Sequence, residues 1–184
     1  MRGLLMLCYG LLVTLPAMAQ HVETLVGAEA AHGGFGGPFL TLTSVAGEPA
    51  VMMGGGGAWV LNHRLFFGGA GHGLVSDVSA GTESVRLGYG GLWMGVLFQS
   101  ERLIHAGMGL LLGGGHVATE DMEHERKGFF AFEPHVFGEL NVSVCFRVTL
   151  GFAYRWISSV RLASLDASDL RGWGLRLGFK FGSQ

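Results

Sequence analysis

The sequence predicts an all-β protein that closes into an eight-stranded antiparallel up-and-down transmembrane β-barrel. Three observations support this fold class. Only 14% of the 184 residues are charged, 33 are glycine and the mean hydropathy is +0.41, whereas charged residues make up ~25% of an ordinary soluble domain. Segments in which apolar residues alternate with small or polar ones recur along the chain. Tight connections between them alternate with longer polar ones, which is typical of barrels that span an outer membrane.

The amino terminus is predicted to be an export signal. An apolar core from Leu4 to Pro16 is followed by Ala17-Met18-Ala19, the small-x-small pattern of a signal-peptidase site. A retained anchor is the alternative, but the run is short for a span of ~20 residues. Without the signal, Cys145 is the only cysteine, so a disulfide within the chain is excluded. The predicted parts are a signal peptide at 1–19, a short leader at 20–32 and the barrel at 33–184.

The barrel is predicted to contain eight strands. Beyond the signal, the chain has no uninterrupted run of 18 apolar residues, which excludes a bundle of membrane-spanning helices. A closed barrel is the other way to satisfy every backbone group in a bilayer. The predicted strands are 33–44, 50–61, 64–75, 84–98, 102–116, 128–140, 144–156 and 171–182.

The connections predict which ends of the strands lie together. Tight connections at 62–63, 99–101 and 141–143 alternate with longer polar ones at 76–83, 117–126 and 158–170, and the first, SVAGEP, is of modest size. Short turns belong to the periplasmic side of outer-membrane barrels and long loops to the outside. The GGGG run at 54–57 is flanked by VMM and AWV, so a strand that approaches its neighbours closely is favoured over a flexible loop.

The last two segments predict the two faces of the wall. In GWGLRLGFKFG every second residue from Trp173 to Phe181 is bulky and apolar, and glycine, Arg176 and Lys180 lie between them. A cation facing lipid at mid-depth costs ~2–4 kcal/mol, so the apolar face is predicted to point outward. The predicted lipid-facing or girdle residues are Tyr154, Trp156, Trp173, Phe179 and Phe181.

Charged residues of both signs are predicted to meet inside the barrel, where they form a structural polar network. Its predicted members are Glu133, His135, Glu139, Arg147, Arg155, Arg176 and Lys180. Glu139 and Arg147 are expected to be diagonal neighbours across the tight 141–143 connection. The facing of 64–75 and 84–98 is not assigned, and Phe137 interrupts the polar face of 128–140, which predicts a bulge or a shift of register there.

Candidate sites for chemistry are weak. The loop at 116–127 gathers His116, Glu120, Asp121, Glu123, His124 and Glu125, but a solvated acidic loop is favoured over a metal site. His135 with Glu133 or Glu139 invites comparison with a lipid A deacylase, yet no serine lies nearby on the same face. His72 and His105 are interpreted as lumen or interface residues. No catalytic residue, metal or cofactor is therefore predicted.

The mature chain resembles the small eight-stranded outer-membrane barrels of Gram-negative bacteria, the OmpA-like and OmpX-like group. GGFGGP and GGGGAWVLNHRLFFGGAGHG are similar to uncharacterised barrels of the Bacteroidetes and Chlorobi lineages. Leu177, Phe179 and Phe181 resemble the terminal signal read by the barrel-assembly machinery, although the chain ends on Gly182-Ser183-Gln184 instead of an aromatic residue. The resemblance implies the outer membrane as location and membrane lipid and that machinery as partners.

The sequence leaves three functions open. The first is a structural or surface-interaction barrel of the cell envelope, with a lumen filled by side chains, because eight strands are too few for a wide porin. The second is a lipid-modifying acyl hydrolase, and the third is a periplasmic lipocalin-like binder with the apolar face inward. The net charge of −2 does not favour nucleic acid as a partner, and the sequence does not identify an extracellular partner.

Overall fold

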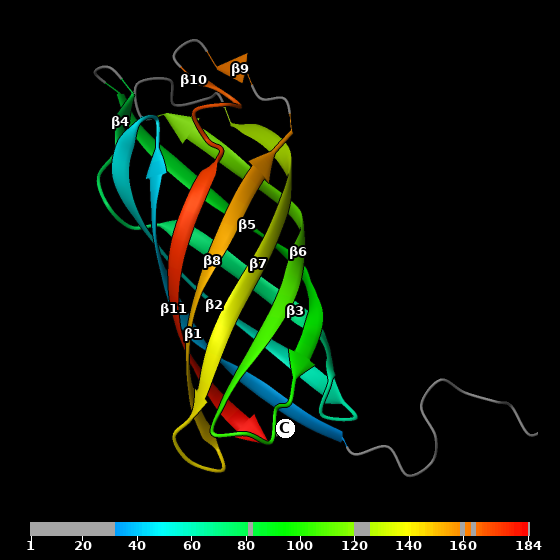
Figure 1. Cartoon of the computed structure of the whole chain (residues 1–184). Coiled ribbons are helices and arrows are strands. Elements are labelled where there is room, and N and C mark those ends of the chain that lie inside the picture. Colours follow the sequence, from blue (N-terminus) through cyan, green and yellow to red (C-terminus); the bar gives the residue numbers. More distant parts are fainter. Residues whose placement is uncertain (1–31, 81–82, 120–125, 159–160, 163–164, 184) are drawn as a thin grey trace, which may run out of the picture.

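The computed structural model describes residues 32–80, 83–119, 126–158, 161–162 and 165–183, and long β-strands make up most of it (Figure 1). The predicted signal peptide and the leader up to residue 31 lie outside the described residues, and His32, assigned to the leader, is the first residue of β1. The long strands are β1 (His32–Val45), β2 (Glu48–Leu61), β3 (Leu65–Leu74), β5 (Glu83–Phe98), β6 (Ile104–Thr119), β7 (Lys127–Asn141), β8 (Phe146–Ile157) and β11 (Gly172–Ser183). The others are β4 (Ser79–Ala80), β9 (Arg161–Leu162) and β10 (Leu165–Asp166).

The eight long strands form one closed antiparallel barrel. Their order is β3, β2, β1, β11, β8, β7, β6, β5, and β3 also pairs with β5, which closes the sheet on itself. The first and last long strands, β1 and β11, are antiparallel neighbours. The predicted fold class is therefore confirmed. Among the described residues, no helix is long and apolar enough to cross a membrane.

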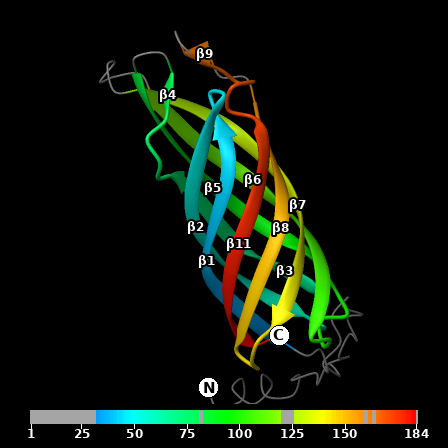
Figure 2. The same cartoon turned by 60° about the vertical axis from the view of Figure 1, so that its left-hand side comes forward.

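The two ends of the barrel differ, as Figures 1 and 2 show. The three connections at the end where β11 stops are short, whereas β4, β9 and β10 lie at the opposite end. The first connection, predicted to be of modest size, is a two-residue turn: Ala46 and Gly47 have φ values of 51° and 79°. Asn62 and His63 repeat this geometry at the other end, with φ values of 52° and 53°. Two successive positive φ values suit the twist of a tight hairpin.

The predicted bulge at Phe137 is wrong. The pairing of β7 with β6 runs without a shift from Ile104–Leu140 to Val117–Lys127, and Phe137 itself pairs with Gly107 and Gly151. Its ring points inward and stacks on His135 with 5.8 Å between centroids. An aromatic ring therefore takes a place on the inner face because the interior combines apolar and charged groups.

Two prolines interrupt the ladder in mid-strand. Pro38 pairs with Gly55 of β2 but has no partner in the register of β1 with β11. Pro134 pairs with Leu110 of β6 and has none in the register of β7 with β8. Proline lacks the backbone N–H that a ladder needs. Each proline therefore leaves one seam of the closed barrel locally unpaired.

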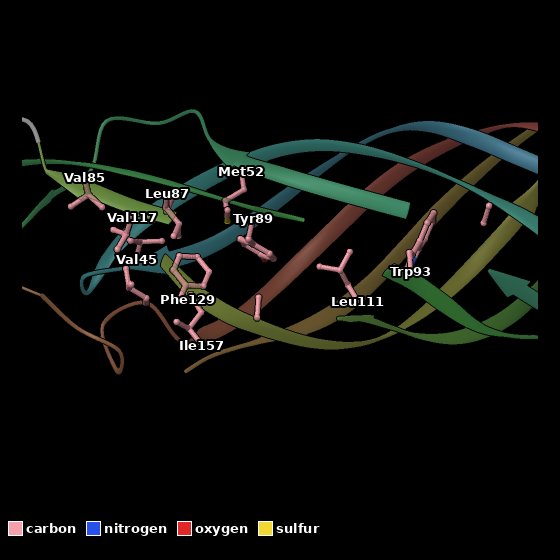
Figure 3. Packing of buried hydrophobic residues seen from close by; sticks show 14 of the residues in the cluster. Val45, Met52, Val85, Leu87, Tyr89, Trp93, Leu111, Val117, Phe129 and Ile157 are labelled. Atoms are coloured by element: carbon pink, nitrogen blue, oxygen red, sulfur yellow. The ribbon is translucent and has the colours of Figure 1, made fainter. Parts of the chain in front are cut away.

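The wall has an apolar outer face and a packed interior. Large apolar side chains point outward around the barrel, with Trp59 and Trp173 73% and 69% exposed. The GGGG run lies within β2, where an added Cβ at Gly56 would come within 3.1 Å of the inward Trp93 ring. Glycine thus leaves room for the inward ring of Trp93, which comes from β5, two strands away from β2. Figure 3 shows part of the apolar interior, from Val85 and Val117 to Leu111 and Trp93.

Candidate functional site in the barrel interior

Alternation on three neighbouring strands places the charged residues inside the barrel. Along β7 every second residue from Phe129 to Glu139 is inward, and β8 and β11 continue the same arrangement beside it. The side chains at these positions are buried or nearly so, Glu133 and Glu139 with 2% and 1% exposure. The predicted lumen residues that the structure places inside are Glu133, His135, Glu139, Arg147, Arg155, Arg176 and Lys180.

The first carboxylate centre is Glu133, midway along the barrel. Arg176 donates from Nη2 to its Oε1 over 2.5 Å, and Tyr89 donates its hydroxyl to Oε2. His72 Nε2 lies 3.5 Å from Oε1. The Arg176 guanidinium also lies 4.8 Å from the centroid of the Phe39 ring. Charge-assisted hydrogen bonds are stronger than neutral ones. Through these partners Glu133 of β7 is connected to β11, β5 and β3.

The second carboxylate centre is Glu139, nearer the short-turn end. Lys180 donates from Nζ to Oε2 over 2.5 Å, His105 Nε2 lies 3.4 Å from Oε1, and Arg147 Nε lies 3.7 Å from the same oxygen. Arg147 pairs with Asn141 and is the diagonal neighbour of Glu139. Lys180 comes from β11, which is separated from β7 by β8. The closest ion pair therefore crosses the interior instead of joining adjacent strands.

Aromatic rings surround the ammonium group of Lys180. Its Nζ lies 4.4 Å from the ring centroids of Phe35 and Phe137 and 5.8 Å from that of Phe66. A cation over aromatic faces is attracted by their quadrupoles, more strongly when water is excluded. Lys180 thus contacts one carboxylate and three aromatic rings. These contacts explain how its positive charge is accommodated among aromatic side chains.

Arg155 is held by two backbone carbonyls and a sulfur atom. Its Nε donates to the carbonyl of Leu170 over 2.6 Å and its Nη2 to the carbonyl of Ser44 over 2.8 Å. Its Nη1 lies 2.9 Å from Met52 Sδ. Ala46 N also donates to the carbonyl of Asp169 over 2.8 Å. The segment before β11 is therefore fastened to the β1–β2 turn at the long-loop end.

An apolar plug fills the interior at the long-loop end (Figure 3). Val78 and Leu170, which belong to connections, are as completely buried as the plug residues of the strands, of which Figure 3 labels Val45, Val85, Val117 and Ile157. The plug residues are Val45, Val78, Val85, Val117, Ile157 and Leu170, all with 5% exposure or less. Apolar packing of this kind excludes water. The interior of the barrel is consequently filled at three levels by the plug and the two carboxylate centres.

The surroundings of His135 do not resemble those of a catalytic base. Its Nε2 accepts a hydrogen bond from Trp93 Nε1 over 3.1 Å, and its ring stacks on Phe137. In a hydrolase of this kind, the nucleophile lies within hydrogen-bond reach of a ring nitrogen of the histidine that activates it. At Nε2 of His135, that place is taken by Trp93.

The loop predicted as a weak metal candidate is described only in part. His116 is exposed on β6, and the acidic residues and histidine from 120 to 125 lie outside the described residues. In the part of the chain that the structure describes, no group of three His, Cys, Asp or Glu side chains is placed to hold a metal ion.

The predicted girdle residues lie on the outer face. Tyr154 and Trp173 are paired across β8 and β11, with 5.0 Å between ring centroids. Trp156 has the Arg171 guanidinium 5.0 Å from its ring centroid. Phe179 and Phe181 pack against Phe146. Apolar rings thus cover the wall outside the charged interior.

Sequence reasoning did not assign Tyr89 and Trp93 of β5 to the network, and it gave His72 of β3 only as a lumen or interface residue. Tyr89, Trp93 and His72 come from 64–75 and 84–98, where glycine on both faces hides the alternation. Counting in steps of two from Phe66 through Gly68 and Ala70 to His72 recovers one inward face, but only if Phe66 is known to point inward. The inward direction of Phe66 is known only from the structure, in which its side chain is buried.

Comparisons with known proteins agree on the fold. No family model matches the sequence, and no curated protein matches it significantly. Solved structures do match: Neisserial surface protein A (11% identity, 83% of this chain and 97% of that chain, TM-score 0.63) and the N-terminal β-barrel domain of Pseudomonas aeruginosa OprF (10%, 82% and 96%, 0.58). The attachment invasion locus protein Ail of Yersinia pestis also matches (12%, 82% and 97%, 0.50). The chain has the fold of these small barrels.

We predict that Tyr89→Phe lowers the free energy of unfolding by about 1.5–3 kcal/mol, because it removes a hydrogen bond to a buried carboxylate. Urea titration in detergent micelles measures this loss. Tyr154→Phe is the matched control because Tyr154 lies on the outer face, and we expect it to change stability by less than about 0.5 kcal/mol. Equal losses in the two variants would contradict the role of Tyr89 at Glu133.

Proposed function

We propose that this chain is an integral outer-membrane barrel with a lumen filled by side chains and a structural or surface-interaction role, and that it is neither a wide porin nor an enzyme. One observation carries the proposal: large apolar side chains cover the outer face of the wall, whereas the charged side chains of Glu133, Glu139 and Lys180 are buried inside the barrel. This arrangement is the reverse of a lipocalin, which keeps its apolar face inward around a ligand. It suits a wall immersed in lipid.

The filled interior supports a role without bulk transport. A path along the axis would have to displace the apolar plug and two carboxylate centres that are already paired with cations. Breaking a buried ion pair by removing one partner costs ~3–5 kcal/mol. A continuous water column through the barrel is therefore unfavourable at rest.

The long-loop end supports a role in surface interaction. Arg155 and the Ala46–Asp169 hydrogen bond fasten the segment before β11 to the barrel rim. A rigid wall that presents loops at one end is a common platform for binding. Ail, which shares the fold, is described as an attachment invasion locus protein. We propose that the long connections of this chain contact partners outside the cell.

The proposed location has three further components. Residues 1–19 are proposed to direct export and to be removed, the terminal strand β11 to be recognised by the barrel-assembly machinery, and outer-membrane lipid to surround the wall. A Gram-negative cell envelope is the compartment that provides all three. We also propose, from the glycine-rich segments of β1 to β3, that the chain is related to barrels of the Bacteroidetes and Chlorobi lineages.

Two measurements on one preparation test the proposal. The protein refolded from urea into detergent is expected to migrate differently on a gel before and after boiling, because a closed barrel resists cold detergent. The same unboiled preparation in a planar bilayer is expected to give no large stable conductance steps, and the boiled sample is the control. Identical gel mobilities together with solubility in plain buffer would contradict the membrane location, and large stable steps would contradict the filled lumen.

A further inference from the structure

A groove of about 510 Å³ runs across the outer surface of the barrel and is lined almost entirely by apolar side chains. It lies on the wall face formed by β5, β6, β7, β8 and β11. One row of its lining follows the register of the sheet: Met94 pairs with Leu110, Leu110 with Pro134, and Tyr154 with Trp173. The groove is therefore built from neighbouring strands and does not depend on a loop.

The dimensions of the groove suit an extended hydrocarbon chain. Strands lie ~4.8 Å apart, so a row across five strands is roughly 19 Å long. Its volume falls within the ~300–1,000 Å³ of small-molecule sites. Pro134, with its compact ring, lies between the larger Leu110 and Tyr154, in the seam where the β7–β8 ladder is unpaired. Pro134 therefore forms the bottom of the groove, and Leu110 and Tyr154 form its two sides.

A cation lies beside the groove at its long-loop end. On β8, Trp156 is the next outward residue after Tyr154. Arg171 lies two residues before Trp173, just ahead of β11. Arg171 is held in place there, since its Nε donates to the carbonyl of Ile157 over 2.9 Å and its guanidinium lies 5.0 Å from the Trp156 ring centroid. A guanidinium presents several donors in a geometry that matches phosphate.

We propose that this groove binds one acyl chain of a phosphate-bearing membrane lipid, with the phosphate at Arg171. The inference rests on the proposed membrane location. Two observations select this occupant: the groove is continuous with the apolar outer face of the wall, and the cation stands at the end where a headgroup would emerge. The lipid is then a stoichiometric ligand, in contrast to the rapidly exchanging lipid elsewhere around the barrel.

Native mass spectrometry of the protein, purified in nonionic detergent and titrated with phosphatidylglycerol, tests this inference. We expect one lipid adduct to dominate before any second. Arg171→Gln is expected to weaken that adduct about tenfold, because a charge-assisted hydrogen bond is lost. Arg171→Lys, which keeps the charge but not the guanidinium geometry, is expected to weaken it less than Arg171→Gln. Dioleoylglycerol, which lacks phosphate, is expected to bind wild type and Arg171→Gln alike.

A pair of variants on β6 tests the groove itself. Met108→Trp fills it, whereas Ile104→Trp adds the same bulk at another exposed outward position of the strand that is outside the groove. We expect the first to weaken the adduct at least about fivefold and the second to leave it unchanged. Equal effects, many weak adducts without a dominant one, or a protein dimer in place of a lipid adduct would overturn the proposal. Gel mobility before and after boiling separates these results from a failure of the barrel to form.

Discussion

Glu139→Ala is expected to lower the free energy of unfolding by about 3–5 kcal/mol, because it leaves buried cations without their carboxylate. Glu139 is 1% exposed and lies 2.5 Å from Lys180 Nζ and 3.7 Å from Arg147 Nε. Arg147 keeps the carbonyl of Gly182 and the side chain of Asn141 as partners. Lys180 is therefore the cation that loses its main partner, and the attraction of its ammonium group to the rings of Phe35 and Phe137 offsets part of the lost stability. Urea titration in detergent micelles gives the magnitude.

A double-mutant cycle separates the ion pair from other effects of the substitution. Lys180→Met removes the cation and keeps an unbranched apolar side chain. On its own, this substitution should leave the buried negative charge of Glu139 without its closest cation. Replacing both partners by apolar groups removes the unpaired charge, and such replacements are often neutral. Glu139→Ala combined with Lys180→Met is therefore expected to be more stable than Glu139→Ala alone.

Glu101→Ala is the matched control for the carboxylate. Glu101 is exposed in the β5–β6 connection at the same end of the barrel, and we expect its loss to change stability by less than about 0.5 kcal/mol. If both glutamates cost the same, or if the double variant is less stable than each single one, the interior placement of Glu139 would be wrong.

The alternation of β8 and β11 made the fold predictable. These strands contrast bulky apolar residues with glycine and cations, for example Phe179 with Lys180, so a one-residue shift would turn every cation outward. The tight connections are equally informative, since Asn62 and His63 adopt the positive φ values of a two-residue hairpin. Strand count, wall order and the two faces of β8 and β11 follow from such local patterns, whereas the faces of β3 and β5 do not.

The ion pairing of the interior could not be predicted in the same way. Lys180 and Glu139 belong to β11 and β7, which are separated by β8, and Tyr89 reaches Glu133 from β5. Such contacts depend on strand tilt and on closure of the barrel, which a local pattern does not contain. Arg155 is an instructive case: its partners are two backbone carbonyls that the fold brings to the rim.

Phe137 shows the limit of a simple polar-inside rule. Alternation alone made it a break in the polar face, because an aromatic ring among Glu133, His135 and Glu139 contradicts the pattern. The structure accommodates it through chemistry, since its ring packs on His135 and faces the Lys180 ammonium at 4.4 Å. A cation can thus be held by rings as well as by carboxylates.

Gly68→Ala is expected to destabilise the barrel by about 3 kcal/mol or more, at the upper end of overpacking effects. A Cβ at Gly68 would collide with the carbonyl oxygen of Gly57 and lie 2.5 Å from Ala58 Cα. Both atoms belong to the backbone of β2, which pairs with β3 at this point. Because no flexible side chain can move aside, the two strands must separate and lose ladder hydrogen bonds. Urea titration and the unboiled gel mobility measure the loss.

Gly69→Ala is the control that distinguishes this collision from a general cost of replacing glycine in β3. A Cβ at Gly69 would have its nearest contact at 3.6 Å, the carbonyl oxygen of Gly91, which is ordinary van der Waals distance. Replacing a glycine at a compatible position stabilises a protein by ~0.4–1 kcal/mol through the unfolded chain. We therefore expect Gly69→Ala to keep or raise stability. Equal losses at both positions would mean that chain flexibility, and not the close approach of β2 and β3, requires glycine there.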